Sequence, residues 1–320
     1  MVKAEEPTDP GFGCAPKDRT LEQKLDAGLI NLDKVAGPTS HEIAAWVKRL
    51  FEGTIVTKAG HGGTLDPKVT GVLPVALNKA TRVVDALLTA GKEYVCIMKL
   101  HGATGEDQIA SILAAFEGMI YQRPPVKAAV KRVIRQREIY YINVMEIDPS
   151  HVLFRVGCEA GTYVRKLCYD FGEVIGCGAH MEELRRTRSG QFSEDKSLVT
   201  LQDVADAIYY WKTEGNPAEL ERILHPMELV FSHIPHVFIR DSAVDPICHG
   251  ANLTAPGVLS LDANIAKGDQ VAIFTQKEEI VAIGNSLGNT QAILDAQAGF
   301  MVEPKQVYMD PGTYPRWVKK

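Results

Sequence analysis

The feature that most constrains the fold of this sequence is a change in the pattern of predicted strands and helices near Phe231. Before that residue, predicted strands and helices are interspersed without the regular alternation that is typical of a doubly wound parallel sheet. After it, short β-like runs such as "DQVAIFT" and "EIVAIGN" follow one another between turn residues, which indicates a small β-rich domain. A chain of 320 residues is long enough for two domains. We therefore predict an α+β fold with a mixed sheet and a separate β-rich C-terminal domain.

Local patterns define the predicted elements and boundaries. Strands are predicted at residues 28–34, 93–100 and 152–159, and a helix at residues 165–176. A second helix is predicted after Thr39, because Thr39 and Glu42 have the spacing of a capping box. Residues 1–19 mix proline, glycine and charge, so we expect a tail that is disordered unless another segment holds it. The predicted division is residues 1–19 as a tail, 20–233 and 234–310 as two domains, and 311–320 as a second tail.

Composition excludes some classes of function. The net charge of -5 argues against a uniformly basic nucleic-acid binder, although a local basic face is compatible with it. The six cysteines include no C-x-x-C pair, so we expect no zinc site and no other metal. Scattered cysteines without a secretion signal favour a reduced, cytoplasmic compartment. No apolar run is long enough to span a membrane, so we expect no membrane partner.

The segment "AGHGGTLDPKVTGVLPVA", residues 59–76, places four glycines around a single acid, Asp66. Glycine is costly to order, so such a cluster indicates a tight turn or a close approach to a ligand. Three interpretations stay open at this point: a simple Asp-Pro turn, a phosphate cradle, or a catalytic carboxylate on a stiff loop. The phosphate cradle is the weakest, because the G-x-x-x-x-G-K-[ST] pattern is absent.

Other stretches carry charge or aromatic side chains. Arg165 in "CEAGTYVRKL" falls in the first turn of a predicted helix, where it either orients a carboxylate or lies exposed. Residues 122–137 hold six basic residues and no acid, which predicts either a solvated face or a track for RNA phosphates. "ELRRTRSG" at residues 183–190 adds three arginines. Tyr94 and Tyr163 are either core aromatics or platforms for a base.

Taken together, five motifs resemble the TruB/dyskerin family of pseudouridine synthases, and most closely its archaeal H/ACA ribonucleoprotein branch. They are "GHGGTLDPKVTGVLPVALNKATRV", "GKEYV", "RPPVKAAVKR", "CEAGTYVRKL" and "GAHMEELRRTRSGQF". The resemblance covers residues 25–307. It implies a mixed-sheet catalytic domain at residues 20–233 and a PUA RNA-binding domain at residues 234–310, on which the N-terminal segment would pack. It also implies the isomerisation of uridine to pseudouridine in RNA.

The same resemblance implies roles for individual residues. Asp66 matches the catalytic aspartate, Arg165 the arginine paired with it, and Tyr94 the tyrosine that stacks near the target base. Tyr163 and Leu184 match residues that line the pocket, and His61 matches the histidine that displaces or receives the flipped base. We expect the Asp66–Arg165 pair to lie in a dry pocket. No cofactor is expected, because the isomerisation takes up no electron or group from outside. A single carboxylate also suits an isomerase better than a water-using glycosidase.

The resemblance further implies an H/ACA guide RNA that selects uridines in ribosomal RNA by base pairing, as in other RNA-guided systems. It implies three small accessory proteins: a zinc-ribbon type, a β-barrel type and a kink-turn binder. A guide-independent enzyme acting on the TΨC loop of tRNA is one alternative, since it shares every catalytic residue. A non-catalytic RNA scaffold is another, against which the intact Asp66, Tyr94 and Arg165 argue. One departure stands out: the family's K-P-P-G-like turn is Lys34-Val35-Ala36-Gly37 here, which predicts a looser turn.

Overall fold

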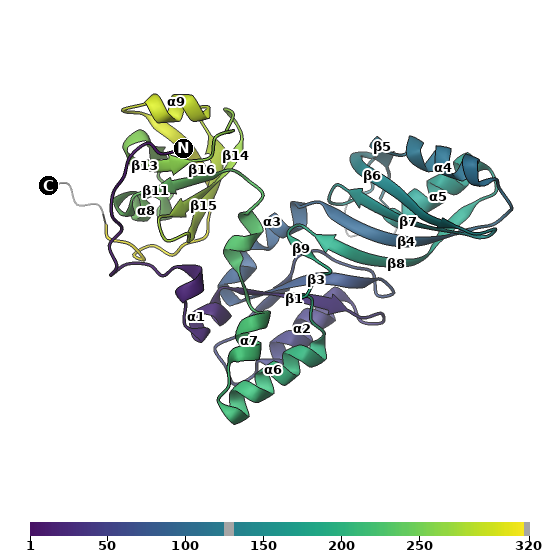
Figure 1. Ribbon diagram of the computed structural model, residues 1–320, viewed down its shortest axis with the longest axis horizontal. Helices are drawn as coiled ribbons and strands as arrows, with labels where there is room; N and C mark the ends of the chain where they lie inside the picture. Colours follow the sequence, from purple (N-terminus) through teal and green to yellow (C-terminus); the bar gives the residue numbers. More distant parts are fainter. Residues whose placement is uncertain (125–130, 317–320) are drawn as a thin grey trace. The chain divides into compact units, whose positions relative to one another are not determined.

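The computed structural model describes residues 1–124 and 131–316 (Figure 1). Its contacts divide the chain into two compact units, each of which is described by itself. The larger unit is Leu25–His225. The smaller unit is discontinuous, because Met1–Lys24 groups with the chain from Pro226 onward. Among the described residues, no helix has the length and apolar character needed to cross a membrane.

A mixed sheet forms the frame of the larger unit. Its central path has the order β1-β3-β8-β4-β7-β6-β5, with β2 beside β3 and β9 beside β8. β3 and β8 run parallel, whereas the other registered pairs of this sheet are antiparallel. The bounds are β1 (Gly28–Lys34), β2 (Ala59–His61), β3 (Thr70–Leu77), β4 (Lys92–Leu100), β5 (Gly118–Gln122), β6 (Arg135–Ile147), β7 (His151–Cys158), β8 (Ala179–Ser189) and β9 (Phe192–Ser193), and β10 (His225–Pro226) ends the unit.

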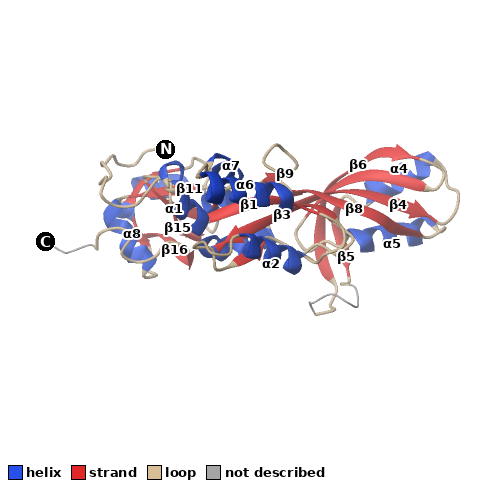
Figure 2. Cartoon of the chain, turned by 90° about the horizontal axis from the view of Figure 1, so that it is seen from below, coloured by secondary structure: helices blue, strands red, loops and turns tan. Residues whose placement is uncertain are grey.

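Helices cover this sheet at two places. At one end, α4 (Glu106–Ala115) and α5 (Val164–Ile175) pack on β4, β6 and β7 through a shared apolar core (Figure 2). Beside β1 and β3 lie α2 (Ser40–Leu50), α6 (Leu201–Glu214) and α7 (Ala218–Ile223) (Figure 1). The predicted capping box at the start of α2 is confirmed, since Thr39 and Glu42 each bond the other's backbone N–H. Short helical turns, η2 (Asn78–Val83) and α3 (Val84–Thr89), join β3 to β4.

The smaller unit contains the predicted β-rich domain. Its six strands have the order β12-β16-β15-β14-β11-β13 around a core of valine, isoleucine and leucine side chains. The bounds are β11 (His236–Ile239), β12 (Leu253–Thr254), β13 (Val258–Leu261), β14 (Gln270–Thr275), β15 (Ile280–Ser286) and β16 (Phe300–Val307). Helices α1 (Leu21–Asp26), which spans the unit boundary, α8 (Asp241–Cys248) and α9 (Thr290–Asp295) and turns η1 (Pro16–Asp18), η3 (Met227–Phe231) and η4 (Ala255–Gly257) complete the list of elements.

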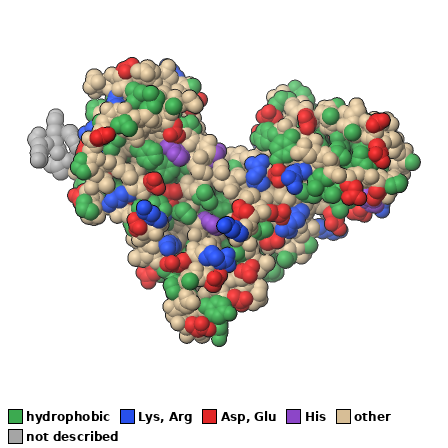
Figure 3. All heavy atoms as spheres, viewed as in Figure 1, with side chains coloured by type: hydrophobic (Ala, Val, Ile, Leu, Met, Phe, Trp, Pro, Cys, Tyr) green, Lys and Arg blue, Asp and Glu red, His purple; other side chains and the backbone are tan. Residues whose placement is uncertain are grey.

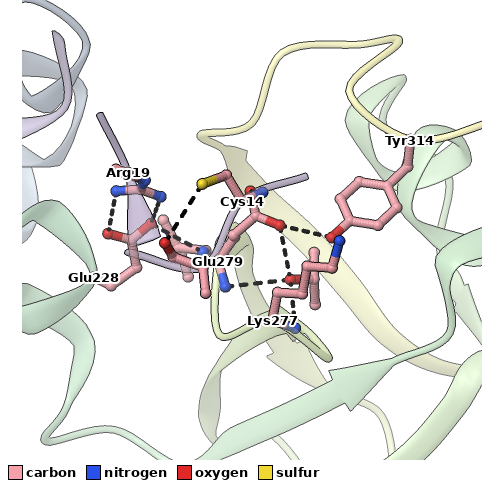
Figure 4. A network of polar contacts seen from close by, with 9 residues as sticks. Cys14, Arg19, Glu228, Lys277, Glu279 and Tyr314 are labelled. Atoms are coloured by element: carbon pink, nitrogen blue, oxygen red, sulfur yellow. Dashed lines mark hydrogen bonds and ion pairs between the residues drawn. The ribbon is translucent and has the colours of Figure 1, made fainter. Parts of the chain in front are cut away.

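The N-terminal residues are held by this smaller unit. The ammonium of Lys3 donates to the carbonyls of Ile293, Leu294 and Ala296 at the end of α9, at 2.6, 2.8 and 2.5 Å. Arg19 forms a bidentate pair with the buried Glu228, at 3.0 and 2.6 Å (Figure 4). Other segments of the smaller unit therefore hold residues 1–19 at both ends, which is the condition under which an ordered tail was expected.

A buried carboxylate joins the N-terminal segment to the last described residues. Glu279 is 5% exposed and accepts a hydrogen bond from the backbone N–H of Cys14 at 2.9 Å. It also accepts one from the hydroxyl of Tyr314 at 2.6 Å (Figure 4). Segments from both ends of the described chain thus complete the core of the smaller unit.

Candidate active site

Asp66 lies on the aspartate loop, which we define as residues 62–69 between β2 and β3. The hydroxyl of Ser40, the first residue of α2, accepts from the N–H of Leu65 at 2.8 Å and lies 3.3 Å from the Leu65 carbonyl. The carbonyl of Asp66 itself accepts from the N–H of Val69 at 2.9 Å. The backbone on both sides of the carboxylate is therefore fixed, while the side chain points out of the loop and is exposed.

The turn at Lys34–Gly37 supports the same loop. The buried ammonium of Lys34 donates to the carbonyls of Val35, Pro67 and Val69, at 2.9, 3.0 and 2.8 Å. Gly37, with a φ of +115°, donates its N–H to Pro67 at 2.9 Å. These bonds tie the turn to the aspartate loop, and they come from Lys34 and Gly37 rather than from Val35 or Ala36. Burial and the charge of Arg186 lower the pKa of Lys34.

Asp66 and Arg165 form a direct ion pair. Arg165 comes from the first turn of α5, as predicted, because α5 begins at Val164. The two side chains remain 52% and 53% exposed, so water reaches the pair. The predicted dry pocket is therefore wrong for the free chain: the carboxylate is oriented by its partner, but bound RNA would have to exclude the water.

Arg186 lies beneath the aspartate loop and is 1% exposed. It donates to the carbonyls of Val72 and Gly63 at 2.7 and 3.1 Å, and it hydrogen-bonds the hydroxyl of Tyr94. Burial raises the pKa of Tyr94, so its phenol stays neutral. A single buried guanidinium thus connects the candidate stacking tyrosine to the loop that carries Asp66.

His61, on β2, contacts a second histidine, His41, at the start of α2. Their rings meet edge to face with centroids 4.7 Å apart, and Nε2 of His61 lies 3.5 Å from Nδ1 of His41. Burial, followed by the neighbouring charges of His41 and Arg186, lowers the pKa of His61 to about 4. His61 is therefore neutral at physiological pH. Its buried Nδ1 has no hydrogen-bond partner among the described residues.

Leu184 and Tyr163, the two residues predicted to line the pocket, lie on β8 and at the start of α5. Leu184, on β8, is paired in register with Cys96 of β4, and with Tyr94 it packs against the core that includes Val164. Tyr163 is the N-cap residue of α5, so it lies two residues before Arg165. The structure brings Asp66 and Arg165 into direct contact, and it places Tyr94 and Leu184 on the core from which α5 begins.

Several residues of the site were not singled out by the sequence. They are Ser40, His41 and Arg186, and Lys34 was named only as part of a turn. One sequence signal could have identified Arg186. Successive side chains of a strand point to opposite faces of the sheet, so Arg185 and Arg186 cannot both be exposed on the same face. Arg185 faces the other way and pairs with Asp33 at 2.9 Å. Arg185 and Arg186 of "ELRRTRSG" thus have different roles.

The basic stretch at residues 122–137 is only partly visible, because Lys127 lies outside the described residues. Arg123, Lys131 and Arg132 are exposed, whereas Arg137 lies 3.6 Å from Glu159. On the face shown in Figure 3, basic and acidic side chains are interspersed, in keeping with the net charge of -5. Among the residues that the structure describes, no cluster of histidine, cysteine or acidic side chains would hold a metal ion.

Comparison with known proteins decides the family. The TruB family pseudouridylate synthase N-terminal domain matches residues 48–164, and the tRNA pseudouridylate synthase B C-terminal domain matches residues 165–232. A PUA domain matches residues 235–308, and a DKCLD domain matches residues 1–44. A protein of Methanopyrus kandleri called probable tRNA pseudouridine synthase B is 56% identical over 316 residues, covering 99% of this chain and 92% of the relative. The chain is a TruB-family pseudouridine synthase.

Solved structures agree with this assignment. The TruB-family chain matches a chain of a Cbf5-Nop10-Gar1 complex with a TM-score of 0.91 and 51% identity, covering 99% of this chain and 96% of that one. It matches a chain of an H/ACA RNP bound to a substrate RNA containing 2'-deoxyuridine with a TM-score of 0.90 and 49% identity, at the same coverage. A relative from Pyrococcus abyssi with the same name as the Methanopyrus protein is 52% identical over 98% of this chain and 92% of its own length. The TruB-family synthase is thus an RNA isomerase with an α+β catalytic fold and a PUA domain.

Proposed function

We propose that Asp66 is the catalytic group with which this pseudouridine synthase isomerises uridine in RNA. The single observation that carries the proposal is the direct ion pair between Asp66 and Arg165, which come from segments about a hundred residues apart. The pair orients the carboxylate, as a nucleophile or base requires. It is also open to solvent, as a site for a macromolecular substrate must be before binding.

The other predicted residues take supporting roles in this proposal. Tyr94 offers its ring face to the target base, with its hydroxyl held by Arg186. Leu184 and Tyr163 line the pocket. Neutral His61 contacts the flipped nucleotide or fills the place it leaves. Enzymes that act on a base take it out of the stack, so contacts of this kind are needed before chemistry begins.

The reaction breaks the C1'–N1 bond of uridine and forms a C1'–C5 bond. The Asp66 carboxylate starts it by one of two routes, attack on C1' or removal of a proton from the sugar. In both, the electron pair of the C1'–N1 bond leaves with the uracil, and the detached ring turns on Tyr94. C5 then bonds to C1'. On the first route this displaces the Asp66 carboxylate from C1', and on the second Asp66 returns the proton to the sugar. The proton on C5 is then lost, and N1 gains one. Atoms and electrons balance without a cofactor. Retaining the loose ring is a problem of orientation, worth up to roughly 7–11 kcal/mol in favourable cases.

We propose guide-directed modification of ribosomal RNA as the setting of this reaction. Two of the solved structures that this chain resembles are a Cbf5-Nop10-Gar1 complex and an H/ACA RNP bound to a substrate RNA. By similarity, this chain binds an H/ACA guide RNA and small accessory proteins of the zinc-ribbon, β-barrel and kink-turn-binding types. Residues 234–310 hold the guide as the PUA domain, and residues 20–233 hold the target. A cytoplasmic location fits the six cysteines, which are free of disulfides.

A second candidate, modification of tRNA without a guide, is supported by the names of the relatives. The proteins of Methanopyrus kandleri and Pyrococcus abyssi are both called probable tRNA pseudouridine synthase B. The catalytic residues are the same in either case. The two candidates differ only in how the uridine is selected.

The role of Asp66 is tested by Asp66→Asn, with Asp170→Asn as the matched control. Asp170 is also a carboxylate in an ion pair, with Lys166 on α5, and it lies outside the proposed site. Asp66→Asn keeps the size of the side chain and removes its charge. We expect it to abolish pseudouridine formation while RNA binding stays close to that of the wild type. Asp170→Asn should remain active. Retained turnover by Asp66→Asn would remove Asp66 from the centre of the mechanism.

A further inference from the structure

Gln122 holds the backbone of Tyr163 at two points. It is the last residue of β5 and is 2% exposed. Its amide oxygen accepts the N–H of Tyr163 at 2.9 Å, and its amide nitrogen donates to the carbonyl of Tyr163 at 3.2 Å. A glutamine amide presents one acceptor and two donors, so it imitates a neighbouring peptide group. Both polar groups of one backbone residue are thereby bound by one side chain.

The residue that Gln122 holds determines where α5 begins. Tyr163 is the N-cap of that helix, and its own side chain makes no capping bond. Its carbonyl also accepts from the N–H groups of Lys166 and Leu167 in the first turn, each at 3.0 Å. The first turn of a helix depends on such caps for its position. Arg165 lies within this turn, so the Gln122 amide sets the point from which Arg165 reaches Asp66.

A second contact from the same hairpin supports the turn before the helix. Arg137, on β6, lies against Gly161: a Cβ added to Gly161 would lie 3.1 Å from the Arg137 guanidinium. Gly161 has a φ of +80°, which favours glycine. Arg137 also lies 3.6 Å from Glu159, at the start of this turn. The β5–β6 hairpin therefore contacts both ends of the segment 159–163, through Arg137 at Glu159 and through Gln122 at Tyr163.

The same hairpin carries the basic stretch. Gln122 is paired in register with Arg135 and is followed directly by the exposed Arg123. A residue that bonds to the helix start is thus adjacent in sequence to a cation suited to RNA phosphates. The hairpin is the physical connection between these cations and the ion pair of Asp66 and Arg165.

We propose that Gln122 is a positioning residue for the isomerisation, which aligns Arg165 by fixing the backbone of Tyr163 from the basic hairpin. This inference rests on the proposed role of Arg165 as the partner of Asp66. Gln122 does not touch the reacting atoms. It acts through the start of α5, and it makes the geometry of the ion pair depend on the hairpin.

The test compares Gln122→Met with Gln136→Met. Methionine keeps the length of the side chain and removes both bonds to Tyr163. Gln136 lies in the same hairpin, opposite Tyr121, and donates to the Tyr121 hydroxyl at 2.9 Å from an exposed position, so it controls for the change in side chain. Pseudouridine formation is measured in single turnover at saturating enzyme with an assembled guide and a ribosomal RNA fragment. RNA affinity and melting temperature are measured in parallel.

Positioning predicts a slower chemical step with little change in binding. We expect Gln122→Met to lower the single-turnover rate roughly 10- to 100-fold, the size of effect produced by misplacing a reacting group by about an ångström. Gln136→Met should stay within about twofold of the wild type. Gln122→Glu keeps an acceptor for the Tyr163 N–H but sets a second oxygen against the Tyr163 carbonyl in a buried place, so its rate should fall at least as far as that of Gln122→Met.

A double-mutant cycle separates positioning from simple structural support. If Gln122 acts through Arg165, Gln122→Met should slow an Arg165→Lys enzyme much less than it slows the wild type, because effects on one functional unit are not additive. Equal losses in both backgrounds would contradict the proposal. So would an unchanged rate, or a failure of both Gln122 variants to fold while Gln136→Met folds. If Asp66→Asn keeps turnover, the proposed site fails instead, whatever Gln122 does.

Discussion

At the scale of single residues, the proposed chemistry depends on buried cations that support an exposed ion pair. Asp66 and Arg165 were both identifiable from motifs, since "GTLDP" and "GTYVR" hold them at fixed offsets. The cations beneath them were not, because burial of Lys34 and Arg186 depends on which backbone carbonyls come near in the fold. In the sequence alone, Arg186 is indistinguishable from the other two arginines of its motif, and Lys34 is one residue of a turn.

His61 makes the stability of the protein depend on pH. Its pKa in the folded chain, about 4, lies below the ordinary value of 6.5. Between these values the unfolded chain binds more protons than the folded chain, so stability rises as the pH rises from about 4 to 6.5. One proton contributes at most about 1.4 kcal/mol per pH unit. His61→Asn should flatten this part of the curve in urea unfolding, whereas His233→Asn, at an exposed site, should not. An unchanged slope in His61→Asn would show that His61 is not the responsible group.

At the scale of elements, periodicity located the strands and helices but not their pairing. The predicted strand at residues 93–100 and helix at residues 165–176 correspond closely to β4 and α5. The parallel pairing of β3 with β8 was not predictable, because it joins Gly71 to Arg186 across more than a hundred residues. That pairing places the buried arginine under the aspartate loop. The sequence thus identified the parts of the site, and long-range pairing assembled them.

Gly71 shows how close this pairing is. It has a φ of +102°, and a Cβ added to it would lie 2.2 Å from the backbone oxygen of Arg186. Gly71→Ala should therefore destabilise the protein by about 2–4 kcal/mol, from an unfavourable backbone angle together with overpacking. Gly53→Ala is the control, since Gly53 has a φ of +80° and no atom within 4 Å of an added Cβ. Chemical denaturation should show the larger loss for Gly71→Ala. Equal losses of unfolding free energy in the two variants would mean that the added Cβ at Gly71 is accommodated against β8 without a loss of stability.

At the scale of the whole molecule, the chain divides into two units, and the smaller one combines the first residues of the sequence with the last. The β-rich texture after Phe231 identified the smaller unit, but composition gave no partner for the first nineteen residues. Two of their partners, Glu228 and Glu279, are acids more than two hundred residues away. The sequence does not show that these two acids are buried and need partners, so it predicts a disordered tail.

Breaking the Arg19–Glu228 pair tests how much the N-terminal segment stabilises the smaller unit. Arg19→Met would leave the carboxylate of Glu228, which is 8% exposed, without its bidentate partner. Breaking a buried pair from one side costs about 3–5 kcal/mol, so the melting temperature should fall clearly. Lys305→Met, which breaks an exposed pair with Glu303, should cost no more than about 1 kcal/mol. A loss from Arg19→Met no larger than that of Lys305→Met would mean that the N-terminal segment adds little to the stability of the smaller unit.

The most direct test of the account is to map pseudouridine in RNA treated with the wild type and with Asp66→Asn. The substrates are a ribosomal RNA fragment, with and without a matching H/ACA guide and accessory proteins, and an unmodified tRNA. We predict pseudouridine in the fragment only with the guide and the wild-type enzyme, and none with Asp66→Asn. Modification of tRNA alone would support the guide-independent candidate. Product formed by Asp66→Asn, or RNA bound without product by the wild type, would contradict the central claim that Asp66 carries the isomerisation.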